Sequence, residues 1–108
     1  MKRSDSVRLS DIASAIATIR THLAAKEGAT ELKRDAILYN LLIIGEAVKA
    51  LTDEARAHQP SVPWRQIGGL RDLIAHECFR IDMQEVQRLV DHDLEPLAAA
   101  VAVLRKRG

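Results

Sequence analysis

An arginine and a histidine stand five residues apart in the segment RDLIAHECF, residues 71–79, and their side chains suit chemistry on a phosphodiester. Arg71 can bind two phosphate oxygens at once and keeps its charge at neutral pH. His76 can accept or donate a proton near neutral pH. The pair therefore suits RNA cleavage by the neighbouring 2′-hydroxyl. In that reaction a base deprotonates the hydroxyl, an acid protonates the leaving 5′-oxygen, and an arginine stabilises charge on the phosphoryl group.

The spacing of the pair limits how it can act. Residues on a helix advance by about 100° each, so Arg71 and His76 would point roughly 140° apart on a continuous helix. Either the helix ends between them or a second chain supplies the missing group. The reaction needs an acid and a base, and a two-fold dimer would bring two histidines together. Asp72 lies four residues before His76, on the same helical face, and could orient the imidazole.

A structural interpretation stands beside this one, since an arginine and a histidine at this spacing arise often by chance and His76 could cap or pack near a helix end. Glu46 lies on an apolar segment, where an unpaired carboxylate would be costly, so a salt bridge to another helix is favoured over a place in the cleft. Asn40 is expected to satisfy buried backbone or to face the cleft. Arg80 is expected either to contact phosphate or to be solvated in a turn.

Composition favours one helical domain in a reducing compartment. The chain has 108 residues, of which 47% are hydrophobic but only 3% aromatic, a mix that favours aliphatic packing of helices over a β-sandwich. The net charge of +1 argues against bulk affinity for nucleic acid, so any RNA contact must be local. The single cysteine makes no intrachain disulfide, and the histidines show no metal-ligand spacing, so we expect no metal and no cofactor. With no apolar run long enough to span a bilayer, the expected location is cytoplasmic.

Four long helical segments are expected to position these residues. Apolar residues recur at three- and four-residue steps over about residues 10–26, 31–58, from near 61 through the RDLIAHECF segment, and from 82 to the end. Ser10 or Asp11 could cap the first segment and Thr30 the second, and Asp82 with Glu85 forms an aspartate version of a capping box for the fourth. Pro96 predicts a kink or a break. Gly68 and Gly69 weaken the third segment and would permit close approach of another backbone.

Several segments in a fixed order resemble one family, the HEPN ribonucleases of the HepT type. The segments are DAILYNLLIIGEAVKAL at 35–51, VPWRQIGGLRDLIAH at 62–76, FRID at 79–82 and DLEPL at 93–97, and the similarity covers about residues 11–104. The resemblance implies a single HEPN domain over residues 1–108, an all-α antiparallel bundle of four to five helices. It also implies a homodimer whose two R-x4-H motifs meet in an interface cleft, and a metal-independent endoribonuclease that is the toxin of a toxin–antitoxin pair. The implied antitoxin is a minimal nucleotidyltransferase.

The resemblance assigns roles to individual residues. Arg71 would bind phosphate, His76 would be the general acid/base, and Asp72 would be an orienting residue. The fuller motif of the family is R-x4-H-x-Y, and its tyrosine receives AMP from the antitoxin. Cys78 stands at that position here, and a thiol is a poor substitute for a phenol as a stable AMP acceptor. Inhibition by simple binding, loss of control and loss of toxicity are therefore alternatives.

Two functions from different classes follow from the sequence. The first is an endoribonuclease toxin that uses Arg71 and His76. The second is a catalytically inactive HEPN subunit that only binds its nucleotidyltransferase partner, an alternative motivated by Cys78.

Overall fold

The protein is described by a computed structural model over residues 2–107, in which the chain forms helices and no strand. The elements are α1 (Arg3–Ala24), α2 (Thr30–Ala50), α3 (Asp53–Ala57), α4 (Trp64–Gly68), α5 (Leu70–Glu77), the 3₁₀ turn η1 (Cys78–Arg80), α6 (Met83–Leu89), the π-helical η2 (Val90–Leu94) and α7 (Glu95–Arg107). The predicted all-α class is confirmed. No helix among these residues is both long and apolar enough to cross a membrane.

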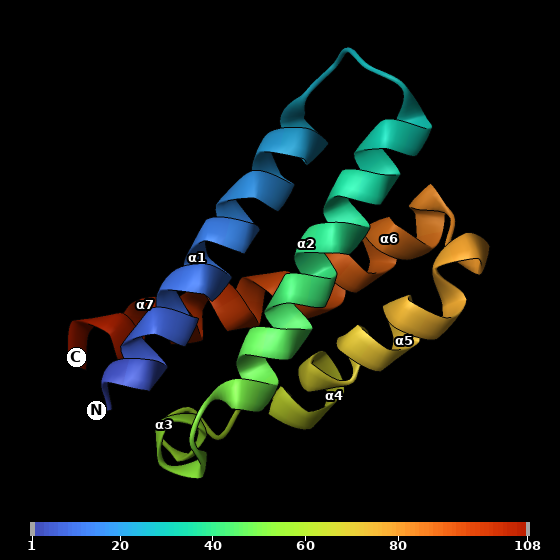
Figure 1. Ribbon diagram of the computed structural model, residues 1–108. Helices are drawn as coiled ribbons and strands as arrows, with labels where there is room; N and C mark the ends of the chain where they lie inside the picture. Colours follow the sequence, from blue (N-terminus) through green and yellow to red (C-terminus); the bar gives the residue numbers. More distant parts are fainter. Residues whose placement is uncertain (1, 108) are drawn as a thin grey trace.

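The centre of the fold is an antiparallel pair, α1 and α2, which turns at Gly28 with φ of 106° (Figure 1). The segment α6–α7 crosses behind this pair, while α4 and α5 lie along the other side of α2 (Figure 1). Aliphatic side chains fill the space between them, and each fully buried leucine or isoleucine stabilises the fold by about 1.5–3 kcal/mol. Those with no more than 1% exposure include Leu9, Ile12, Ile19, Ile37, Leu41, Ile44, Ile67, Leu97 and Leu104.

The first helix begins seven residues earlier than predicted. It starts at Arg3, and neither Ser10 nor Asp11 caps it. The reason is a tertiary contact made by Asp5, which is 1% exposed. Its carboxylate accepts hydrogen bonds from the backbone N–H of Thr52 at 2.9 Å and from the Thr52 hydroxyl at 2.7 Å. A buried carboxylate satisfied in this way fastens the first turn of α1 to the end of α2.

The sequence predicted one helix over about residues 31–58, but in the structure this segment forms two helices, α2 and α3. Helix α2 ends at Ala50 because Leu51 takes an extended conformation, and Thr52 then caps the short α3 by accepting from the N–H of Ala55 at 3.1 Å. Thr30 is the first residue of α2 and makes no side-chain cap. The third segment also divides, at Gly69, as expected from the weak pair Gly68–Gly69.

The last segment shows its predicted aspartate cap, but it continues as a helix through Pro96, where a kink or a break was predicted. The Asp82 carboxylate accepts a hydrogen bond from the N–H of Glu85 at 2.9 Å, so the predicted cap of α6 is confirmed. Before Pro96 the helix widens into the π-helical turn Val90–Leu94 and then continues as α7. Proline lacks an N–H and its ring collides with the preceding turn, which accounts for an irregular turn at this place.

Helix α5 approaches α2 closely at Gly45, and this contact positions the site residue Arg71. A Cβ built there would lie 2.7 Å from the backbone nitrogen of Arg71 and 3.1 Å from its Cβ. Only a glycine in α2 lets the backbone of α5 come this close. The sequence located the close approach at Gly68 and Gly69 instead; a Cβ at Gly68 would meet the flexible Lys49 side chain at 3.3 Å.

Replacing Gly45 by alanine tests this contact. Helix propensity alone favours alanine over glycine by up to about 1 kcal/mol. We expect Gly45→Ala nevertheless to lower the free energy of unfolding by about 1–3 kcal/mol, because the added methyl group would overlap the α5 backbone. Urea unfolding followed by circular dichroism measures the change. The matched control is Gly68→Ala, where the side chain of Lys49 can move aside, and a Gly45→Ala protein as stable as this control would contradict the packing described.

Candidate functional site

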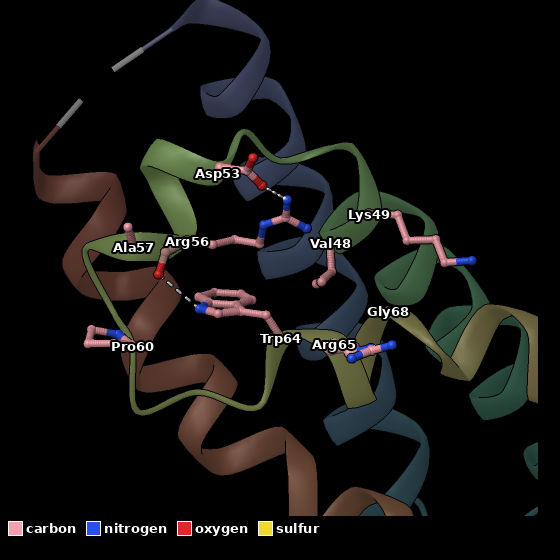
Figure 2. A pocket seen from close by; sticks show the side chains of 9 residues that line it. All are labelled: Val48, Lys49, Asp53, Arg56, Ala57, Pro60, Trp64, Arg65 and Gly68. Carbon is pink, nitrogen blue, oxygen red and sulfur yellow. Dashed lines mark hydrogen bonds and ion pairs between the residues drawn. The ribbon is translucent and has the colours of Figure 1, made fainter.

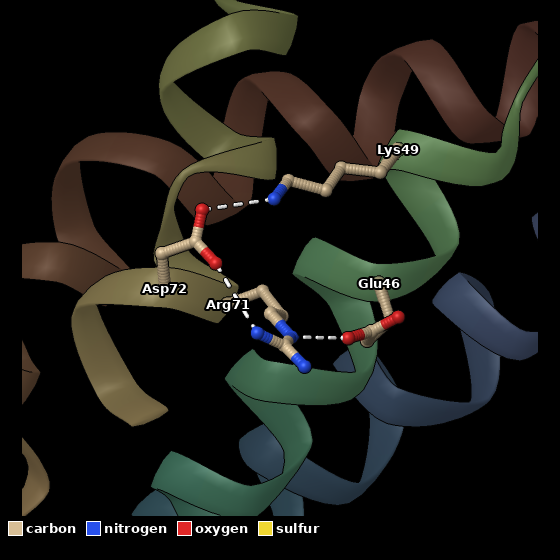
Figure 3. A network of polar contacts seen from close by, with 4 residues as sticks. All are labelled: Glu46, Lys49, Arg71 and Asp72. Atoms are coloured by element: carbon tan, nitrogen blue, oxygen red, sulfur yellow. Dashed lines mark hydrogen bonds and ion pairs between the residues drawn. The ribbon is translucent and has the colours of Figure 1, made fainter. Parts of the chain in front are cut away.

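Arg71 lies in the first turn of α5 and is held by two carboxylates (Figure 3). Its Nε donates to Glu46 of α2 at 2.5 Å, and its Nη1 donates to Asp72 at 3.2 Å. The side chain is 43% exposed, so the guanidinium lies at the surface rather than in the core. The hydrogen bond with Glu46, then that with Asp72, raises the pKa of Arg71 above its ordinary value, and the group stays charged.

A second cation completes the group. Lys49 Nζ donates to Asp72 Oδ2 at 2.9 Å, and Glu46 and Lys49 lie three residues apart on α2 (Figure 3). Carboxylates and cations therefore alternate across the contact between α2 and α5, in the order Glu46, Arg71, Asp72 and Lys49. Exposed ion pairs contribute little to stability, typically about 0–1 kcal/mol each. The effect of the network is to fix where the Arg71 guanidinium lies.

The remaining edge of the guanidinium is available for a ligand. Glu46 takes Nε and Asp72 takes Nη1, and within residues 2–107 the structure records no partner for Nη2. An arginine held on one side by carboxylates and open on the other can present N–H donors to a phosphate in a fixed direction. The arrangement suits binding of a phosphodiester at the surface of α5.

His76 lies on the same unbroken helix as Arg71. Helix α5 runs from Leu70 to Glu77, so it does not end between the two residues. His76 is exposed and faces away from the buried Leu70 and Ile74, roughly 140° around the helix from Arg71. Asp72, the expected orienting residue, pairs with Lys49 and Arg71. The two side chains therefore leave the helix in different directions.

The other candidates lie in positions that suit the scaffold. Asn40 donates to the Ala36 carbonyl of its own helix at 2.8 Å, and Arg80 is exposed and pairs with Glu77 at 3.6 Å. Cys78 is half-buried, packs against the core and begins η1. Trp64 is buried, as expected for a core residue. In the described part of the chain, no group of three or more His, Cys, Asp or Glu side chains is arranged to hold a metal ion.

Lys49 is the site residue that sequence reasoning did not single out. Its signal was present in GEAVKA, where a carboxylate and a lysine three residues apart share a helical face. What the sequence lacked was the neighbour, because the contact with Asp72 depends on α5 packing at Gly45. Glu46 does make the salt bridge to another helix that was expected of it.

The described part of the chain is an all-α bundle that carries Arg71 and His76 on helix α5. The family model described as ribonuclease HepT-like matches residues 10–104, nearly the whole chain. The protein belongs to the HepT-like ribonuclease family.

Named relatives agree with this membership. The chain is 32% identical over 110 residues to "Probable ribonuclease HepT" of Thermococcus cleftensis, covering 98% of this chain and 100% of that protein. It is 32% identical over 71 residues to "Putative RNase MJ1380" of Methanocaldococcus jannaschii, covering 66% and 65% of the two chains. It is 36% identical over 66 residues to "Putative RNase TTE0752" of Caldanaerobacter subterraneus subsp. tengcongensis, covering 61% and 59%. No solved structure matches the chain significantly.

The charge network can be tested by titration. The hydrogen bond from Lys49, then that from Arg71, lowers the pKa of Asp72 below its ordinary value of 3.8. The ionised carboxylate therefore contributes stability that is fully present above pH 3.8 and is lost as the pH falls through the lowered pKa. We expect Lys49→Met to raise the pKa of the Asp72 carboxyl toward its ordinary value, as measured by NMR titration of the carboxyl carbons.

Glu85 supplies the control for this titration. Its pKa is lowered by a hydrogen bond from Arg88, in a pair that Lys49 does not touch. The pKa of Glu85 should stay low in Lys49→Met. An Asp72 pKa that is the same in the variant and the wild type would show that Lys49 and Asp72 do not interact in solution.

Proposed function

We propose that this protein is a metal-independent endoribonuclease, the toxin of a HEPN/nucleotidyltransferase toxin–antitoxin pair. Membership of the HepT-like ribonuclease family supports the ribonuclease. The observation that carries the assignment of the site is Arg71, charged, held in place by Glu46 and Asp72, and open to a ligand at Nη2. His76 on the same exposed helix is the group that can transfer protons.

The proposed reaction needs no group beyond these two residue types. A neutral His76 removes the proton of a ribose 2′-hydroxyl, and the resulting oxygen attacks the adjacent phosphorus. A protonated His76 gives its proton to the leaving 5′-oxygen, so the products are a 2′,3′-cyclic phosphate and a 5′-hydroxyl. Arg71 stabilises the charge that gathers on the phosphoryl oxygens. The base and the acid stand on opposite sides of the phosphorus, and the two must therefore be different imidazoles.

A homodimer would supply the second histidine, and one face of α2 suits its interface. Leu32, Ala36, Tyr39 and Ile43 follow one another at steps of four, three and four residues, which places them in one stripe. Leu32 is 70% exposed and Tyr39 is 65% exposed, on the side of α2 that faces away from the core. Large apolar side chains gathered on an exposed face favour association. The stripe leads to Glu46, so a two-fold axis there would bring both Arg71 side chains near the interface.

A second candidate function is favoured by Cys78. A HEPN subunit without catalytic activity would bind its nucleotidyltransferase partner and need no tyrosine for AMP. Expression in a bacterial host separates the two functions. Growth arrest that the partner relieves supports the toxin, and unaffected growth supports the binding subunit.

Substitution of His76 tests the assigned role. We expect purified wild-type protein to cleave a defined RNA in the presence of EDTA and to leave 2′,3′-cyclic phosphate ends. His76→Ala should lower the rate by at least about 100-fold, since general acid–base catalysis typically contributes that much. Mass spectrometry identifies the ends, and light scattering shows whether the variant keeps its oligomeric state.

The matched control is His22→Ala, in the last turn of α1, which should cleave at the wild-type rate. Cleavage by His76→Ala at the rate of this control would remove His76 from the mechanism. Loss of cleavage in EDTA would instead show that the reaction requires a metal ion.

Mixing of wild-type and inactive subunits tests whether two chains share one site. His76→Ala should be inactive alone. Because the base and the acid are the His76 side chains of two chains, a dimer of one wild-type chain and one His76→Ala chain holds a single imidazole and should not cleave. Unfolding and refolding equal amounts of the two proteins together should therefore leave about one quarter of the rate of an all-wild-type sample of the same total concentration, since about one quarter of the dimers carry both histidines.

Tyr39→Glu provides the control for assembly. A charge in the apolar stripe should convert the dimer to monomer and lower the cleavage rate with it. A rate of about one half, with mixed dimers shown to form by native mass spectrometry, would show that each site is built within one chain.

A further inference from the structure

The chain has one tryptophan, one tyrosine and one phenylalanine, and these rings differ in how far they are exposed. Trp64 is 9% exposed and forms part of the wall of a hollow of about 500 Å³ between the end of α2, α3 and α4 (Figure 2). Its indole N–H donates to the carbonyls of Gln59 at 2.9 Å and Arg56 at 3.1 Å, and the Arg56 side chain extends alongside the ring. The tryptophan ring therefore belongs to the core and is closed to a ligand.

The other two rings lie at the surface. Tyr39 is 65% exposed and belongs to the stripe of α2 that suits a second copy of the chain. Phe79 is 93% exposed, more than any other large hydrophobic side chain of residues 2–107. An apolar ring left in water is unfavourable, and contact with another flat apolar surface would remove its area from water. Phe79 is therefore the aromatic surface that a ligand can reach most easily.

The 3₁₀ turn η1 directs Phe79 outward. Residues three apart lie above one another in such a turn. Cys78, which begins the turn, packs against the core, and Ile81, which follows it, is 4% exposed. Phe79 and Arg80 stand between these two inward-facing residues and point away from the core. Arg34 of α2 donates to the Ile81 carbonyl at 3.2 Å, so the end of the turn is anchored and the ring is presented in a fixed direction.

Phe79 continues a row of exposed side chains that contains His76. Leu73, His76 and Phe79 follow one another at steps of three residues, the spacing of one ridge on a helix surface, and η1 follows α5 without a gap. Leu73 is 39% exposed, and His76 is exposed. The row ends at the turn between α5 and α6, at the edge of the bundle away from both termini (Figure 1). The imidazole therefore has an aliphatic and an aromatic neighbour, each about one helical turn away.

A base of single-stranded RNA suits this row. Unpaired bases expose flat apolar faces, which stack on aromatic side chains. Each base is attached to a ribose, and the ribose carries the 2′-hydroxyl that the proposed mechanism deprotonates at His76. A base on Phe79 would hold its ribose within about one helical turn of the imidazole. Positioning of this kind brings the reacting atoms into place for attack.

Arg80 supplies a cation next to the ring. Its side chain is 85% exposed, and its Nε lies 3.6 Å from the Glu77 carboxylate. This distance exceeds that of a normal hydrogen bond, and exposed ion pairs contribute little stability. The guanidinium can therefore exchange this contact for a phosphate of the strand whose base lies on Phe79. Proteins that bind single strands combine aromatic rings with cations in this way.

We propose that Phe79 is a base-stacking residue of the ribonuclease. It holds the base of a nucleotide at the cleaved bond, and Arg80 binds an adjoining phosphate. The inference rests on the proposed ribonuclease function, because it takes the substrate of that function to be a single strand of RNA. Phe79 transfers no proton, and its role is to position the ribose at His76.

Binding of a strand that cannot be cleaved tests this role. The probe is a 2′-O-methyl RNA tetranucleotide, which lacks the attacking hydroxyl, and fluorescence anisotropy gives its affinity. We expect Phe79→Ala to weaken binding by roughly five- to thirtyfold through the loss of one stacked base, and Phe79→Trp to bind as tightly as the wild type. Phe79→Leu keeps an apolar side chain without a ring and should bind nearly as weakly as Phe79→Ala. The values of kcat/KM for RNA should follow the same order.

Matched controls show whether the contact requires a base and a ring. Val7→Ala shortens a side chain that is 52% exposed on α1 and should bind the probe as the wild type does. An abasic tetranucleotide of the same charge should bind equally to the wild type and to Phe79→Ala. In Phe79→Trp the probe should quench an emission that is absent from the wild type, whose only tryptophan is the buried Trp64.

Three results would overturn the assignment to a base. These are equal affinity of the probe for the wild type and Phe79→Ala, wild-type affinity in Phe79→Leu, and an equal loss of affinity for the abasic strand. Light scattering adds a fourth, because a dimer that Phe79→Ala converts to monomer would assign the ring to contact with a second copy. The melting temperature should stay unchanged in all variants, since the ring is 93% exposed.

Binding and cleavage can fail separately in this design. Cleavage by Phe79→Ala at the kcat/KM of the wild type would overturn the stacking role and leave the ribonuclease intact. Binding of the probe that depends on the ring, in a protein that cleaves no RNA, would support the stacking role and overturn the proposed cleavage.

Discussion

The contact of α5 with α2 at Gly45 is the constraint on which the candidate site depends. Because the backbone nitrogen of Arg71 would lie 2.7 Å from a Cβ at Gly45, the two helices touch without a side chain between them. This distance brings Glu46 within hydrogen-bond reach of Arg71 and Lys49 within reach of Asp72. The order of residues in GEAVK thus has a physical meaning: the glycine admits the neighbouring helix, and the residues that follow it bind the charged side chains that helix presents.

The ion pairs of the site are supported by the core and contribute little to its stability. All four charged side chains are about half exposed, and exposed pairs add at most about 1 kcal/mol each. Burial of aliphatic side chains around α2 holds the helices at this distance. The fold therefore depends little on these charges.

Features that follow from local periodicity and capping could be predicted from the sequence. The apolar repeat around Ile12 and Ile19 and the aspartate cap at Asp82 are local signals, and both appear in the structure. Features that depend on tertiary partners could not. The early start of α1 requires Thr52, 47 residues away, to satisfy buried Asp5. The site follows the same division, because the Arg71–His76 motif is a local pattern whereas the role of Lys49 depends on a neighbouring helix.

Helix α5 is unbroken, and this limits how Arg71 and His76 can act in the proposed mechanism. A helix that runs from Leu70 to Glu77 without interruption directs Arg71 toward α2 and His76 toward solvent. The two side chains therefore leave the helix in directions roughly 140° apart. In the proposed mechanism a second chain supplies one of the groups that act on the phosphate, and the exposed stripe with Leu32 and Tyr39 offers a surface for that second copy. In the proposed mechanism dimerisation is a condition of catalysis, because one chain supplies a single His76 and the reaction uses two imidazoles.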